Sequence, residues 1–352
     1  EEDGIRIMKK PVLAITMGDP AGIGPEVTVK ALQHRELWEK CIPVVVGEPH
    51  VLEDALRFSD LKQAVHSIRT PEEAVGEPGM IECLDLHALA PENYRLGQVS
   101  AACGEAAFQY IVKAIDYAMA GRVAGVVTAP INKEALHLAG HLYSGHTEIF
   151  ADYTHTPHYA MLLMSGRLRV IHCTTHVSMR KACDLITRER VGEVIGLADQ
   201  AMRMMGLEHY TIGVAGLNAH CSENGLFGTE EAEAISPAIQ DAQARGIPVE
   251  GPIPPDTVFV KALAGQYDVV VAMYHDQGHI PLKVVGFQLD AATGRFTSLS
   301  GINTTIGLPI LRTSVDHGTA FDKAGKNLAN EASMVEALEL AAQMAPYYQK
   351  KE

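Results

Sequence analysis

Three histidines stand where chemistry is expected in an α/β protein. His176, His220 and His275 each follow a short apolar run by a few residues. Such runs are typical of buried parallel strands, and ligands of open α/β sheets lie just past the carboxyl ends of strands. Three imidazoles suit Zn²⁺ or a similar divalent ion. Any one of them alone is better explained as a hydrogen-bonded loop histidine, so the metal hypothesis depends on their common placement.

The polar stretch after the apolar run Tyr267–Val271 adds further groups. It contains His275 and Asp276, and Lys283 follows a few residues later. We expect these three side chains to lie in one loop at the end of a strand. A metal ligand, a carboxylate and a lysine in one loop suggest work on a charged small molecule.

Two cations lie in apolar sequence. Lys283 stands in IPLKVVGF and Arg312 in GLPILRTS, where an unpaired charge would be costly. A bound phosphate or carboxylate would offset that cost. A structural salt bridge to one of the 43 acidic residues is the competing explanation.

Two further segments could bind an anion or a cofactor. Gly145–Glu148 opens a predicted helix, where His146 or Thr147 could cap the helix and its free N–H groups would favour an anion. Gly18–Glu26 joins the first strand to the first helix, and its glycines allow close backbone approach. The latter segment matches neither the dinucleotide fingerprint nor a P-loop, and a tight structural turn explains it equally well.

The elements that would position these groups alternate between strand and helix. Val12–Thr16 is a predicted strand, Asn132–Ala139 a helix capped by Asn132, and Tyr159–Met164 and Leu168–His172 are paired strands around a Ser165-Gly166 turn. Gln288–Ser300 is polar and weakly patterned, so we expect a loop. The whole pattern predicts an α/β fold with a mainly parallel sheet.

Composition limits the class of protein. A chain of 352 residues suits two domains, and 47% hydrophobic with 20% charged residues indicates a packed globular enzyme. A net charge of -14 argues against nucleic-acid binding, although a local cationic cleft could still take an anionic substrate. No apolar run approaches the ~20 residues that span a bilayer, so no membrane partner is expected.

The start of the chain and the cysteines predict a cytoplasmic location. The segment Glu1–Lys10 is charged and lacks the apolar core of a signal peptide. Six cysteines are scattered with no CxxC pair, which is typical of reduced thiols in a cytosolic protein.

Taken together, these motifs resemble the 4-hydroxythreonine-4-phosphate dehydrogenase (PdxA) family. The resemblance covers nearly the whole chain, through MGDPAGIGPE, TAPINK, GHTE, TTH, GLNAH, PPDT, YHDQG and RTSVDHGTA in that order. NKEALHLAGH and GQYDVVVAMYHDQGHIPLK are similar to the branch that acts on 4-phospho-D-threonate and 4-phospho-D-erythronate. The family is similar in fold to isocitrate and isopropylmalate dehydrogenases, which implies two α/β/α domains with a central cleft.

The resemblance also implies a domain plan. Residues 1–140 plus 304–352 would form one α/β domain that carries the cofactor loop. Residues 141–303 would form the middle domain, with the metal site and the dimer interface. The chain would act as a homodimer whose metal ligands come from both subunits.

The resemblance assigns roles residue by residue. The metal ligands would be His176, His220 and His275. The phosphorylated substrate would contact His146, Thr147, Lys283, Asn303 and Arg312. The cofactor, NAD with NADP as the alternative, would lie against His317, Gly318, Asp322 and Asn330 in the segment from His317 to Asn330. The candidates for proton transfer are Asp256, Asp276 and Lys133, and the sequence does not choose among them.

The implied reaction is a metal-dependent, NAD-linked oxidation of a 4-phosphorylated 3-hydroxy acid followed by decarboxylation. With 4-phospho-D-threonate or 4-phospho-D-erythronate it would give dihydroxyacetone phosphate and CO₂, with Zn, Mg, Mn or Co as the metal. The alternative within the family is 4-phosphohydroxy-L-threonine dehydrogenase of pyridoxal phosphate biosynthesis. A phosphometabolite-binding protein without activity and a phosphotransacylase-like enzyme are the alternatives outside it.

Overall fold

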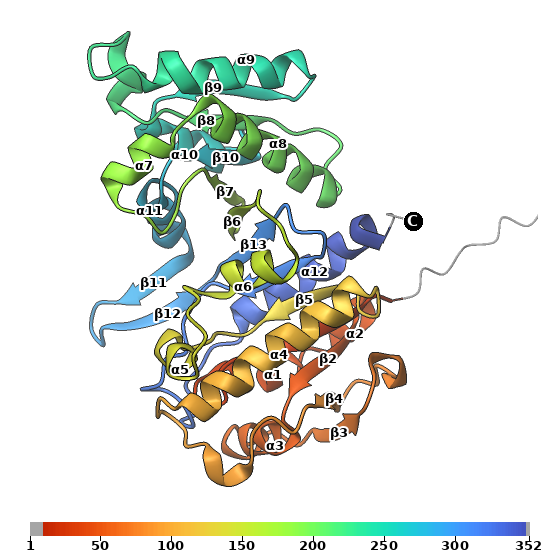
Figure 1. Cartoon of the computed structure of the whole chain (residues 1–352). Helices are drawn as coiled ribbons and strands as arrows, with labels where there is room; N and C mark the ends of the chain where they lie inside the picture. Colours follow the sequence, from red (N-terminus) through yellow and green to blue (C-terminus); the bar gives the residue numbers. More distant parts are fainter. Residues whose placement is uncertain (1–9, 350–352) are drawn as a thin grey trace, which may run out of the picture. The chain divides into compact units, whose positions relative to one another are not determined.

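The structure is a computed structural model that describes residues 10–349 (Figure 1). The charged N-terminal segment Glu1–Lys10 lies almost wholly outside the described residues. The chain divides into two compact units. Of the described residues, unit 1 contains 10–146, 310–312 and 318–349, and unit 2 contains 147–309 and 313–317. The predicted boundaries at 140/141 and 303/304 differ from these, and residues 304–309 and 313–317 group with unit 2.

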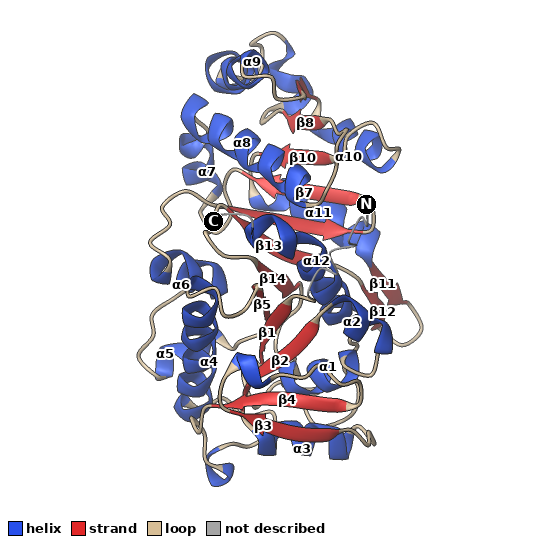
Figure 2. Ribbon diagram, turned by 90° about the vertical axis from the view of Figure 1, so that its right-hand side faces the viewer, coloured by secondary structure: helices blue, strands red, loops and turns tan. Residues whose placement is uncertain are grey.

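Unit 1 is built on a parallel sheet with the strand order β3-β4-β2-β1-β5. Helix α4 packs on β1, β2 and β5, while α12 contacts β5, β1, α1 and α2, so the helices lie on both faces of the sheet (Figure 2). The elements are β1 (Val12–Thr16), α1 (Gly24–Ala31), α2 (Arg35–Lys40), β2 (Ile42–Gly47), α3 (Pro49–Phe58), β3 (Ala64–Ile68), β4 (Met80–Asp85), α4 (Ala101–Met119), β5 (Gly125–Thr128), α5 (Lys133–Leu138) and α12 (Ala332–Gln349).

Unit 2 has a mixed sheet with the order β14-β13-β6-β7-β10-β8-β9. The pairs from β14 to β7 are antiparallel and those from β7 to β9 are parallel. Helix α8 covers one face, while α10 and α11 cover the other (Figure 2). The elements are α6 (His146–Tyr153), whose first residue belongs to unit 1, β6 (Ala160–Ser165), β7 (Leu168–His172), α7 (Met179–Leu185), α8 (Arg188–Met204), β8 (Ile212–Ala215), α9 (Ser236–Ala244), β9 (Val249–Ile253), α10 (Pro255–Leu263), β10 (Val269–Ala272), α11 (His275–Gly286), β11 (Phe287–Asp290), β12 (Arg295–Leu299), β13 (Ile302–Ile306) and β14 (Arg312–Val315).

Several sequence-based expectations are confirmed. The first strand has the predicted bounds, Val12–Thr16. Asn132 caps α5, because its Oδ1 accepts a hydrogen bond from the Ala135 N–H at 2.8 Å. Strands β6 and β7 form the predicted antiparallel pair, with Gly166 in the turn at φ 54°. Within residues 10–349, no helix has the length and apolarity that crossing a bilayer requires.

Two predicted loops are wrong. Gln288–Ser300 contains most of a two-stranded antiparallel ribbon, β11 with β12, joined at a turn with Gly294 at φ 65°. The polar stretch from His275 to Lys283 is the greater part of helix α11. Gly278 and Pro281 lower the helix propensity of that stretch, but α11 packs against β6 and β7, and tertiary contacts override propensity.

Candidate active site

One face of helix α11 carries three polar side chains. His275, His279 and Lys283 are spaced four residues apart, and such residues lie above one another on one side of a helix. This face replaces the predicted loop as the framework for His275 and Lys283. His279 is absent from the predicted site, although its spacing from His275 is a signal that the sequence already contained.

Two of the three predicted metal ligands lie together in unit 2. The rings of His176 and His275 have centroids 5.6 Å apart, and both side chains line a hollow of about 400 Å³ next to the start of α7. The Nδ1 of His275 lies 2.7 Å from Asp276 Oδ1. A carboxylate can only accept there, so Nδ1 carries the proton and Nε2 remains available to a metal.

The third predicted metal ligand, His220, contacts neither His176 nor His275 in any interaction described for this chain. His220 follows β8 in left-handed backbone at φ 52°, and its Nδ1 lies 3.2 Å from Glu223 Oε2. Its side chain is 64% exposed. Among residues 10–349 of this single chain, no three histidine, cysteine or carboxylate side chains are grouped to hold a metal ion. The donor set of one chain therefore fits a divalent metal in part, through His176 and His275.

Three neighbouring imidazoles extend from the core to this hollow, and two of them are stacked. His275 and His279 stack with centroids 3.6 Å apart and planes at 11°, and His172 lies behind His279 at 4.7 Å. Burial is the main cause that lowers the pKa of His172 to about 3 and that of His279 to about 4. Both rings are therefore neutral near pH 7.

Lys283 has a protein partner. Its Nζ lies 2.5 Å from Asp316 Oδ2, with the lysine side chain 34% and the aspartate 19% exposed, and it also lies 4.3 Å from the centre of the Phe287 ring. The competing explanation of a salt bridge thus applies to Lys283. On β13, Asn303 has a buried Oδ1 without a hydrogen-bond partner. A buried acceptor without a donor is costly, and a ligand hydroxyl or ammonium group would satisfy it.

In unit 1, a neutral histidine lies near a buried arginine, Arg312, which is the one residue of β14 that belongs to this unit. Arg312 is 2% exposed, and its Nη2 donates to Thr128 Oγ1 at 3.0 Å. The Nε2 of His146 is buried without a partner, and burial, followed by the charge of Arg312, lowers the pKa of His146 well below its ordinary value. A guanidinium beside a neutral imidazole can donate to an anion. Thr147 follows in the first turn of α6 and is buried.

The loop between β1 and α1 is held by backbone contacts. Gly18 has φ +76°, and a Cβ there would lie 2.3 Å from the Pro130 carbonyl oxygen, so only glycine fits. The Ile23 N–H donates to the Thr319 carbonyl at 2.9 Å, and a Cβ on Gly22 would lie 2.9 Å from Thr319 Cβ. The loop thus packs closely on the start of the predicted cofactor segment.

The end of that segment is held by α1. Glu26 is fully buried, and its Oε1 accepts from Lys30 Nζ at 2.7 Å and from the Ala329 N–H at 2.9 Å. Lys30 Nζ also donates to the Ala329 carbonyl at 2.8 Å. Both backbone polar groups of Ala329, its N–H and its carbonyl, are therefore hydrogen-bonded to side chains of α1.

Asp19 is a buried carboxyl group in the same loop. It is 1% exposed; Oδ1 accepts from the Ala21 N–H at 2.9 Å, and Oδ2 has no partner. Burial raises the pKa of Asp19 to about 6, against the opposing effect of the Ala21 N–H. No sequence pattern singled out this residue, although it stands inside the GDPAG motif.

The predicted cofactor residues divide between the units. His317 belongs to unit 2, and Gly318, Asp322 and Asn330 belong to unit 1, where all three are exposed. Asn330 Oδ1 accepts from the Ala332 N–H at 2.8 Å at the start of α12. Helix capping is therefore one role that Asn330 already has.

The three proton-transfer candidates occupy three helices. Asp276, on α11, is hydrogen-bonded to His275. Asp256 is exposed in the first turn of α10, and Lys133 is the first residue of α5 in unit 1 and is exposed. The contact with His275 would allow Asp276 to orient that ring, and Asp256, Asp276 and Lys133 all stay candidates for proton transfer.

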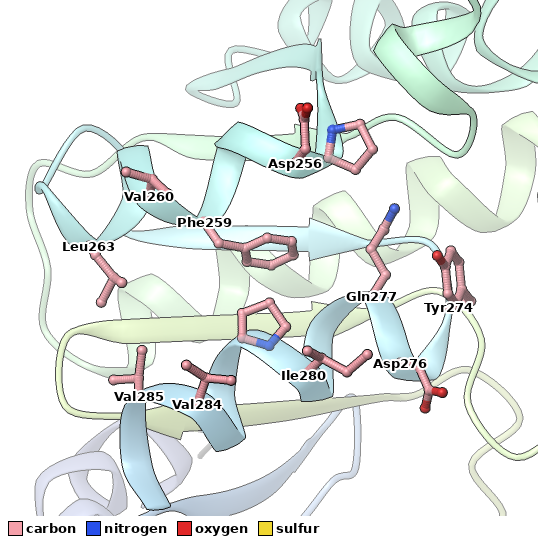
Figure 3. A pocket seen from close by; sticks show the side chains of 12 residues that line it. Asp256, Phe259, Val260, Leu263, Tyr274, Asp276, Gln277, Ile280, Val284 and Val285 are labelled. Carbon is pink, nitrogen blue, oxygen red and sulfur yellow. The ribbon is translucent and has the colours of Figure 1, made fainter.

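An apolar groove of about 500 Å³ lies between α10 and α11 (Figure 3). Phe259, Ile280 and Val284 point into it, and Val284 is 76% exposed. Tyr274 and Asp276 line both this groove and the hollow that contains His176 and His275. The two features therefore form one continuous surface of unit 2.

Comparisons with known proteins agree with the motifs. The family model described as pyridoxal phosphate biosynthetic protein PdxA matches residues 39–341. A putative D-threonate 4-phosphate dehydrogenase of Oceanobacillus iheyensis is 49% identical over 96% of this chain and 99% of its own length. The D-threonate 4-phosphate dehydrogenase of Cupriavidus necator is 47% identical over 95% and 97%.

A solved structure agrees as well. The crystal structure of 4-hydroxythreonine-4-phosphate dehydrogenase from Klebsiella pneumoniae is 46% identical, with a TM-score of 0.83, and the match covers 96% of this chain and 100% of that one. The likeness extends over both units, which confirms the predicted α/β fold class. From the family model, the relatives and the fold, the chain belongs to the PdxA family.

Proposed function

We propose that this protein is an NAD-linked dehydrogenase that oxidises and decarboxylates D-threonate 4-phosphate or D-erythronate 4-phosphate. The observation that carries the proposal is the 47% identity, over nearly the full length of both chains, with the D-threonate 4-phosphate dehydrogenase of Cupriavidus necator. The buried cation Arg312 beside the neutral His146 supports an anionic substrate.

By the family resemblance, we assign the phosphorylated substrate to five residues: His146, Thr147, Lys283, Asn303 and Arg312. Arg312 offers a guanidinium to a phosphate oxygen, and the imidazole of His146 offers a neutral donor. Lys283 would exchange part of its contact with Asp316 for the phosphate. The unsatisfied Oδ1 of Asn303 would accept from a substrate hydroxyl, which gives the site a polar contact beyond the phosphate.

When bound, NAD would serve as the acceptor of the hydride from the C3–H bond of the substrate, while the alcohol proton would pass to a base on the protein. The resulting β-keto acid then loses its carboxylate as CO₂, and the electron pair of the broken bond forms an enolate that is reprotonated. Asp256, Asp276 and Lys133 are the open candidates for moving these protons, and Asp276 would also orient His275. NAD is the expected cofactor, NADP the alternative, and His317, Gly318, Asp322 and Asn330 are proposed to bind it.

His176, His220 and His275 are proposed to hold a divalent ion, Zn, Mg, Mn or Co, which when bound would stabilise negative charge on the substrate oxygen. Since the described residues of one chain group only part of this set, we propose that a second copy supplies the rest. The apolar groove between α10 and α11 adjoins the histidine hollow and is the surface proposed for that homodimer. The cytoplasmic location likewise stays a prediction.

The test is NADH formation with D-threonate 4-phosphate, D-erythronate 4-phosphate and 4-phosphohydroxy-L-threonine, each with and without added divalent metal. Turnover of the first two at a higher kcat/KM than the third supports the proposal. Preference for the third would assign the chain to pyridoxal phosphate biosynthesis instead. No turnover of any, with NAD binding absent by calorimetry, would favour a binding protein.

A further inference from the structure

We propose that His279 is a positioning residue that fixes the imidazole plane of His275 by stacking on it. The inference rests on the proposed metal site and goes beyond it, because it assigns a role to a side chain outside the three histidines. The two rings lie with centroids 3.6 Å apart and planes at 11°, which is close, parallel contact.

His275 needs such support. It is the first residue of α11, its side chain is 37% exposed, and its one hydrogen-bonded side-chain contact is with Asp276, which is itself 68% exposed. One hydrogen bond at Nδ1 restrains that atom but leaves the ring free to tilt. A flat surface against one face of the ring restricts the tilt and so directs Nε2.

The ring of His279 is itself restrained by a hydrogen bond and by a neighbouring ring. Its Nδ1 lies 2.8 Å from the His275 carbonyl oxygen, within the same helix turn. The buried ring of His172 lies 4.7 Å away and is anchored through its Nδ1 to the Met161 carbonyl at 3.2 Å. A Cβ on Gly278 would lie 2.2 Å from His172 Nε2, so glycine at 278 admits this ring against α11. His279 is therefore backed by a tilted, buried ring at the end of strand β7.

The shape of the side chain at 279, rather than its nitrogen atoms, carries the proposed effect. His279→Phe keeps a flat ring, whereas His279→Leu keeps an apolar side chain that fills space without one. We expect His279→Leu to weaken metal binding by roughly 10- to 100-fold, the usual cost of losing an orienting partner, and His279→Phe to stay within about 3-fold of the unaltered protein. The exposed His66→Ala is the matched control and should bind as the unaltered protein does.

The measurement is isothermal calorimetry of Zn²⁺ or Co²⁺ binding to the full chain without substrate, with thermal unfolding midpoints to verify folding. Equal affinity of His279→Leu and the unaltered protein would overturn the positioning role. Equal weakening of both variants would also overturn it, since His279 would then act through a nitrogen. If the unaltered protein binds no metal, the metal site of the proposed function fails with it, and that result is distinct from the other two.

Discussion

The polar face of α11 and the loop between β1 and α1 position their polar groups in opposite ways. On α11, three side chains at four-residue spacing present imidazole and ammonium groups, and the backbone serves only as a helix. In the loop, backbone groups make the contacts, as from Ile23 to Thr319, and side chains are absent where the approach is closest. The first region should therefore be sensitive to the removal of atoms, and the second to their addition.

The largest expected effect concerns the metal site to which the polar face of α11 contributes His275, and the variant lies outside that face, after β8. His220→Ala should abolish NADH formation even with divalent metal in excess, because it removes an imidazole assigned to the metal. The side chain is 64% exposed, so the free energy of unfolding should change by no more than about 0.5 kcal/mol. His209→Ala, at another exposed histidine, is the control. Full activity of the His220 variant would exclude the metal role.

Lys283→Met should have the next largest effect. It removes a cation from the polar face and with it the ion pair to Asp316. A hydrogen bond to a charged group contributes about 1.5–3 kcal/mol, so KM for the phosphorylated substrate should rise roughly 10- to 100-fold. Lys62→Met, at an exposed lysine of unit 1, should leave KM as it is. If KM is unchanged in Lys283→Met, the salt bridge with Asp316 is the whole role of this lysine.

Gly22→Ala tests the backbone half. The added methyl group would lie 2.9 Å from Thr319 Cβ and 3.0 Å from the Thr319 carbonyl oxygen, so the loop or the cofactor segment must shift. We expect a loss of about 1–3 kcal/mol in the free energy of unfolding and a higher KM for NAD. Gly196→Ala, where a Cβ meets no atom within 4 Å, should instead be neutral or stabilising. If Gly22→Ala and Gly196→Ala have the same free energy of unfolding and the same KM for NAD, the loop is not specially sensitive to added atoms.

Asp19→Asn should change turnover least of the four variants. It tests the loop between β1 and α1 through the pH dependence of the free energy of unfolding. Burial raises the pKa of this carboxyl group to about 6, so the folded protein holds its proton more tightly than the unfolded chain does. The contribution of Asp19 to stability is therefore present below about pH 4, is lost as pH rises to about 6, and is constant above that. Asparagine does not titrate, so the difference in unfolding free energy between the two proteins should change across this window and nowhere else. A parallel pair of stability curves from pH 4 to pH 8 would contradict it.

The sequence predicted the elements whose signals are local. Asn132 caps its helix because a side-chain oxygen reaches an N–H three residues on, and this contact needs no knowledge of the rest of the chain. The alternation of buried strands and amphipathic helices likewise predicted the fold class. The motif types then selected histidines and cations that the structure does place at the ends of strands or on helices beside them.

What the sequence could not predict depends on distant contacts. Helix α11 contains a glycine and a proline, and its stability comes from packing on β6 and β7, so local propensity indicated a loop. The partner of Lys283 is Asp316, one of 43 acidic residues and 33 positions away. The orphaned oxygens of Asp19 and Asn303 are visible only once burial is known.

The hydrogen bonds of Glu26 and Lys30 to the backbone of Ala329 also have a consequence for folding during translation. Glu26 and Ala329 are 303 residues apart, whereas nearly all of unit 2 is one continuous stretch. A contact cannot form before both partners have been synthesised. The hydrogen bond between Glu26 and Ala329 can therefore form only after residue 329 has left the ribosome. We therefore expect unit 2 to reach its folded state first during translation, and a chain that stops before Ala329 to leave its N-terminal unit unfinished.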